Sequence, residues 1–107
     1  MPEKKSVDYY VDLPEGISKQ QVMTLVERAV ESVGLYISHI GGYSRKKYPN
    51  SVHWHVKRDK KETGIIDATF WDARSLLWLM VQRRNAPWVK AMVPKLHKAL
   101  KREASIL

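Results

Sequence analysis

Two histidines with a single residue between them, His53 and His55, have a spacing that could support chemistry. On a β-strand both imidazoles would point to the same side of the sheet, because side chains alternate between its faces. Asp67, on the strand expected next, is a candidate third metal ligand. A pair of histidines is a weak metal signature, since the third ligand is usually missing. We therefore expect no metal site and no bound cofactor.

Tryptophans and cations form a second pattern. The basic loop Arg45-Lys46-Lys47 is flanked by Tyr43 and Tyr48, and Trp71 and Trp78 fall in two consecutive predicted strands. Aromatic rings can stack on nucleic-acid bases while nearby cations hold the phosphates. The candidate nucleic-acid-binding residues are Arg45, Lys46, Lys47, His53, His55, Lys57, Trp71, Arg74 and Trp78.

The overall charge favours the same class of partner. The 107 residues contain 19 Lys and Arg against 11 Asp and Glu, a formal net charge of +8. Such an excess is common in proteins that bind DNA or RNA, although it also keeps small proteins in solution. The sequence does not distinguish DNA from RNA.

Several classes of protein receive no support. Cysteine is absent, which excludes disulfides, a thiolate nucleophile and sulfur-ligated zinc. Gly41-Gly42 fits no phosphate-binding loop, and no serine lies in a nucleophile motif, so we name no catalytic residue. A small enzyme with an active site assembled from distant residues stays an alternative. We see no secretory signal and no apolar segment of membrane-spanning length, and we expect a cytoplasmic protein with no membrane partner.

The elements that would position these residues follow from periodicity. Alternating apolar residues predict a strand over 7–13, and a helix follows from the capping box of Ser18 and Gln21 to the stop at Gly34. A second helix should start at Asn85 as N-cap and be kinked or broken at Pro94. Four further strands are expected over residues 35–43 (bulged or bent at Gly41-Gly42), 51–58, 63–71 and 74–82.

This order, β-α-β-β-β-β-α, predicts one α+β domain over residues 1–107. Short connections favour an antiparallel meander, with both helices on one face of the sheet and the other face open. The element order is similar to that of one half of the TATA-binding-protein fold. The resemblance is one of order alone, and it implies no function.

Strand pairing decides which residues share the open face. With a two- or four-residue connection we expect Trp71 opposite Arg74, Thr69 opposite Leu76 and Asp67 opposite Trp78. The histidines and tryptophans would then lie on the open face. We expect this face to bind nucleic acid, and the alternative is that it packs against a protein partner or a second copy of the chain.

Overall fold

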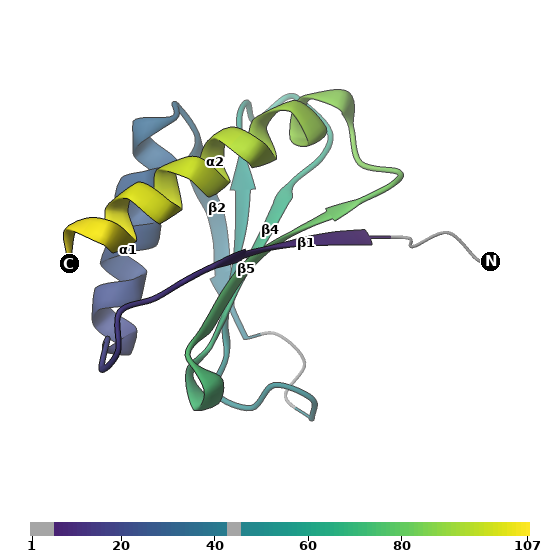
Figure 1. Cartoon of the computed structure of the whole chain (residues 1–107). Coiled ribbons are helices and arrows are strands. Elements are labelled where there is room, and N and C mark those ends of the chain that lie inside the picture. Colours follow the sequence, from purple (N-terminus) through teal and green to yellow (C-terminus); the bar gives the residue numbers. More distant parts are fainter. Residues whose placement is uncertain (1–5, 43–45) are drawn as a thin grey trace.

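The computed structural model describes residues 6–42 and 46–107. Within them the chain forms a five-stranded antiparallel sheet, ordered β1-β5-β4-β3-β2, and two α-helices (Figure 1). The β-α-β-β-β-β-α order and the α+β class are as predicted. The elements are β1 (Ser6–Val11), α1 (Lys19–Ser32), β2 (Tyr36–Gly41), β3 (Val52–Lys57), β4 (Ile66–Trp71), β5 (Leu76–Gln82), a 3-10 turn (Asp72–Arg74) and α2 (Pro87–Ile106).

The start of α1 follows the expected capping box. The backbone amide of Gln21 donates to Ser18 Oγ over 3.1 Å, and the amide of Ser18 donates to Gln21 Oε1 over 2.9 Å. Each side chain thus satisfies an amide that the first helical turn leaves without a partner. After the helix, Gly34 takes a positive φ of 76°, which a side chain would disfavour.

The expected N-cap of α2 was wrong, and no break falls at Pro94. Ala86, not Asn85, is its N-cap, and the Asn85 side chain instead accepts from the backbone amide of Gln82 in the turn after β5. The helix is also unbroken at Pro94. Proline removes the hydrogen bond to the carbonyl of Lys90, but Lys90 is exposed, so water can solvate that carbonyl.

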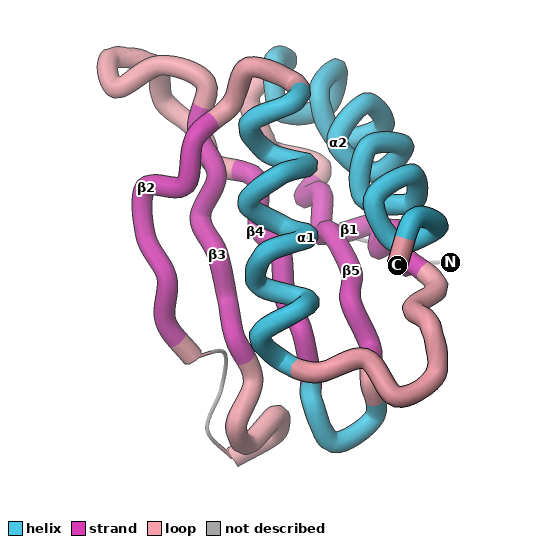
Figure 2. Tube along the Cα trace, turned by 90° about the vertical axis from the view of Figure 1, so that its left-hand side faces the viewer, coloured by secondary structure: helices cyan, strands magenta, loops and turns pink. Residues whose placement is uncertain are grey.

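Both helices lie on one face of the sheet, as Figure 2 shows, and the core fills the space between these layers. The core includes Val22, Leu25, Val26 and Ala29 from α1, Leu96 from α2, and Trp54, Phe70, Leu77 and Leu79 from the sheet. No helix in the described part of the chain is both long and apolar enough to cross a bilayer.

Strand β2 differs from its expected form. We placed a strand over residues 35–43 with an irregularity at Gly41-Gly42, but the register shift against β3 falls between Ile37 and His39. Residue 43 lies outside the described residues. The shift still leaves His39 opposite His55, on the same face of the sheet.

Candidate functional site

The face of the sheet opposite the helices, here called the open face, carries the candidate residues. Because side chains alternate along each strand, the registers place one set of residues from all five strands on this face. It comprises Asp8 and Tyr10 of β1, Leu76, Trp78 and Met80 of β5, Asp67, Thr69 and Trp71 of β4, His53, His55 and Lys57 of β3, and Tyr36 and His39 of β2.

The pairing of β4 with β5 differs from our expectation by two residues. Trp71 lies opposite Leu76 rather than Arg74, because four residues connect the strands and form a 3-10 turn that ends at Ser75 with a φ of 50°. A shift of two residues leaves every side chain on the same face of the sheet, so the candidate residues still share the open face. The other β4–β5 pairs on the open face are Thr69 with Trp78 and Asp67 with Met80.

Three aromatic rings cluster at the end of the open face where the β2–β3 and β4–β5 connections lie. The centroid of the Tyr48 ring is 5.0 Å from that of Trp71 and 5.5 Å from that of Trp78. Trp78 is buried, with 7% of its surface exposed, whereas Trp71 and Tyr48 are partly exposed. Nothing local in the sequence indicated that Tyr48 would cover Trp78.

Cations lie against the two outer rings. The guanidinium carbon of Arg74 is 5.9 Å from the centroid of Trp71, and Lys47 Nζ is 5.5 Å from that of Tyr48. Lys46 is exposed in the same loop. We call this group, Lys46, Lys47, Tyr48, Trp71 and Arg74, the aromatic end. The candidate Arg45 lies outside the described residues, and Lys57 lies half-buried at the other end of β3.

The histidine pair forms a polar network in the middle of the open face. His53 Nδ1 is 2.7 Å from Thr69 Oγ1, and His53 Nε2 is 3.1 Å from Asp67 Oδ1. His55 Nε2 approaches the same carboxylate oxygen to 3.6 Å. The rings of His39 and His55 lie with centroids 5.3 Å apart. The structure thus brings Asp67 against both histidines.

The environment of His55 disfavours its protonated form. Partial burial lowers the pKa of its imidazole, and the neighbouring His53 and His39 lower it further, against the opposing effect of the Asp67 carboxylate. A neutral imidazole keeps a nitrogen lone pair available as an acceptor or a ligand.

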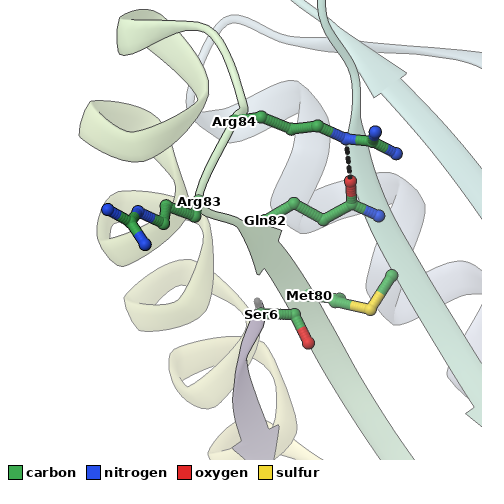
Figure 3. Close-up of a pocket in the computed structure, with 5 residues that line it drawn as sticks. All are labelled: Ser6, Met80, Gln82, Arg83 and Arg84. Atoms are coloured by element: carbon green, nitrogen blue, oxygen red, sulfur yellow. Dashed lines mark hydrogen bonds between the residues drawn. The ribbon is translucent and has the colours of Figure 1, made fainter. Parts of the chain in front are cut away.

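Sequence reasoning missed a hollow at the far end of the open face. It has a volume of about 680 Å³ and is lined by Ser6, Met80, Gln82, Arg83 and Arg84 (Figure 3). The Arg84 Nε–H donates to Gln82 Oε1 over 3.0 Å, which directs this guanidinium back toward the sheet. Arg83 and Arg84, which follow β5 in the sequence, were the signal from which positive charge at this end could have been predicted. Positively charged side chains therefore lie at both ends of the open face.

Comparisons with protein-family models, curated protein sequences and solved structures yield no match. The fold and the site define a small α+β domain with an open face that is aromatic and basic at its rim.

Proposed function

We propose that this protein binds single-stranded nucleic acid through the aromatic end of its open face. The observation that carries the proposal is the pairing of two partly exposed rings with cations, Trp71 with Arg74 and Tyr48 with Lys47. Rings offer a stacking surface to any base, and cations beside them neutralise the phosphates.

The accessibility of the Trp71 ring supports stacking. Trp71 is partly exposed, and the guanidinium of the exposed Arg74 lies over its ring. A base could take the place of the guanidinium while Arg74 rotates toward a phosphate. Trp78 has another role in this proposal: it is buried, and its ring packs against that of Tyr48.

The distribution of charge suggests a path for the strand. Asp8 and Asp67 make the middle of the open face unfavourable for phosphates, whereas cations lie at both ends. Strands of six residues are about 20 Å long, so a few nucleotides would span the face. We infer that phosphates are held by the aromatic end and by Lys57 and Arg84, with bases directed toward the sheet between them.

A homodimer through the open face is the second candidate. Tyr10 and Leu76 lie on this face and are 55% and 37% exposed, and neighbouring apolar side chains left exposed on a sheet face can mark an interface. Sedimentation at high micromolar concentration tests it directly: a dimer that Leu76→Lys converts to a monomer supports this candidate, and a monomeric wild type removes it.

Fluorescence anisotropy with a labelled oligothymidylate tests the nucleic-acid proposal. Arg74→Ala removes a cation from the aromatic end, and Lys98→Ala removes one from the exposed side of α2, on the other side of the molecule. We expect Arg74→Ala to weaken binding several-fold and Lys98→Ala to change it little. Equal losses in both variants would indicate generic attraction between a basic protein and a polyanion, and would contradict the proposal.

A further inference from the structure

A divalent metal ion fits the middle of the open face better than the sequence alone indicated. The expectation of no metal rested on the rule that a histidine pair usually lacks a third ligand, and the sequence alone could not place Asp67 beside the pair. The β3–β4 register removes that objection, because it places Asp67 directly opposite His55. His53, His55 and Asp67 each offer one ligand atom, and these atoms all lie within 4.8 Å of one another.

We propose that His53, His55 and Asp67 form a binding site for a divalent transition-metal ion of the zinc class. Imidazole nitrogen and carboxylate oxygen are ordinary ligands of such ions, at about 2.0–2.2 Å. Three ligands at that distance in tetrahedral arrangement lie about 3.4 Å from one another. The separations from Asp67 Oδ1, 3.1 Å to His53 Nε2 and 3.6 Å to His55 Nε2, lie on either side of this value.

The orientation of the histidines also suits a metal. The His53 and His55 rings are nearly perpendicular, at 87°, with centroids 5.0 Å apart, and the Nε2 atom of each ring approaches Asp67 Oδ1. Asp67 and His53 are largely buried, with 14% and 10% of their side chains exposed, which fixes their positions. His55 is 34% exposed, so an ion can enter from solvent and keep a water as its fourth ligand.

Thr69 is the positioning residue of this site. Metal-binding histidines normally hydrogen-bond through their second ring nitrogen, which sets the tautomer and holds the ring. His53 Nδ1 is 2.7 Å from the buried Thr69 Oγ1. In the tautomer that carries its proton on Nδ1, Nδ1–H donates to this hydroxyl and the lone pair on Nε2 points toward the Asp67 carboxylate, where a positive charge would offset the repulsion. A metal ion supplies that charge.

The test is Zn²⁺ titration of untagged, metal-stripped protein against a competing chromophoric chelator. We expect one ion per chain and a rise in Tm on binding, since a ligand of the folded state stabilises it. His55→Ala and Asp67→Asn should each weaken binding at least tenfold, with folding checked by circular dichroism. His97→Ala is the matched control, because His97 lies outside the cluster with its Nε2 2.7 Å from the carbonyl oxygen of Tyr10. It should bind Zn²⁺ as the wild type does.

Two further variants separate the positioning role of Thr69 from general packing. Thr69→Ser keeps the hydroxyl and should retain near-wild-type affinity, whereas Thr69→Val keeps the shape and should lose about 10- to 100-fold. The visible spectrum of bound Co²⁺ should change in Thr69→Val and not in Thr69→Ser. Absence of stoichiometric binding to the folded wild type overturns the proposal. So does affinity unchanged in folded His55→Ala and Asp67→Asn, or reduced as much in His97→Ala.

Discussion

The rings of Tyr48 and Trp78 are in contact, with centroids 5.5 Å apart. Tyr10 lies against the same tryptophan at 5.9 Å, and together these contacts leave Trp78 with 7% of its surface exposed. The loop that leads into β3 therefore covers part of the sheet face that the strands alone would leave open. Of the two tryptophans on this face, Trp71 is the more exposed.

Replacing the exposed tryptophan should reduce binding without changing its salt dependence. Trp71→Ala removes the stacking surface, and stacking to one base contributes about 1–3 kcal/mol, while releasing no counterions. We expect a loss of this size on oligothymidylate by anisotropy, with the slope of log K against log salt unchanged. Binding equal to that of the wild type would remove Trp71 from the interface.

The salt dependence itself should report the number of phosphates contacted. Each neutralised phosphate of a single strand contributes about −0.7 to the slope of log K against log salt, so engagement of Lys46, Lys47, Lys57, Arg74 and Arg84 predicts about −3.5. Lys46→Ala should flatten the slope by about 0.7. The same flattening in Lys98→Ala would mean that the cations of α2 bind the strand as well.

Truncation of a helix residue in the core should destabilise the fold strongly. Leu96 is fully buried, and Leu96→Ala should lower the free energy of unfolding by about 2–5 kcal/mol in urea denaturation. Leu76→Ala is the control, because Leu76 is 37% exposed on the open face. Leu76→Ala should lower the free energy of unfolding by clearly less than Leu96→Ala does. A loss well under 1 kcal/mol at Leu96 would show that α2 does not pack on the face of the sheet opposite the open face.

The low pKa of His55 should make the metal-free protein less stable in mild acid. Its pKa in the folded state lies below the ordinary value of 6.5, so the unfolded chain binds more protons between these two values. Above pH 6.5 His55 is neutral in both states and costs no stability. The free energy of unfolding then falls as the pH is lowered from 6.5 through the folded-state pKa. With EDTA present, the wild type should lose more stability than His55→Gln between about pH 7 and pH 5. Identical pH profiles would contradict the assignment.

Local periodicity predicted the elements and faces, but not the contacts that the chain makes across them. The alternation of His53, His55 and Lys57 was enough to place all three on one face. The distance from Asp67 to the histidines depends on the β3–β4 register, which the connection between Lys57 and Ile66 leaves undetermined in the sequence. Contacts that depend on the strand register could therefore not be predicted from the sequence.

The β4–β5 connection and the Tyr48 loop illustrate that limit. A turn of two residues and one of four give the same faces, so the pattern could not choose between Arg74 and Leu76 as the partner of Trp71. The path of residues 46–50 follows no period at all, and only the structure places Tyr48 against Trp78.

Amide chemical-shift mapping during titration with oligothymidylate tests the central claim most directly, because it locates the bound strand on the molecule. We predict that the largest shifts fall on Lys46, Lys47, Tyr48, Trp71 and Arg74, and that the exposed face of α2 around Lys98 stays nearly unchanged. Shifts concentrated on α2, or spread evenly over every basic residue, would contradict an interface at the aromatic end.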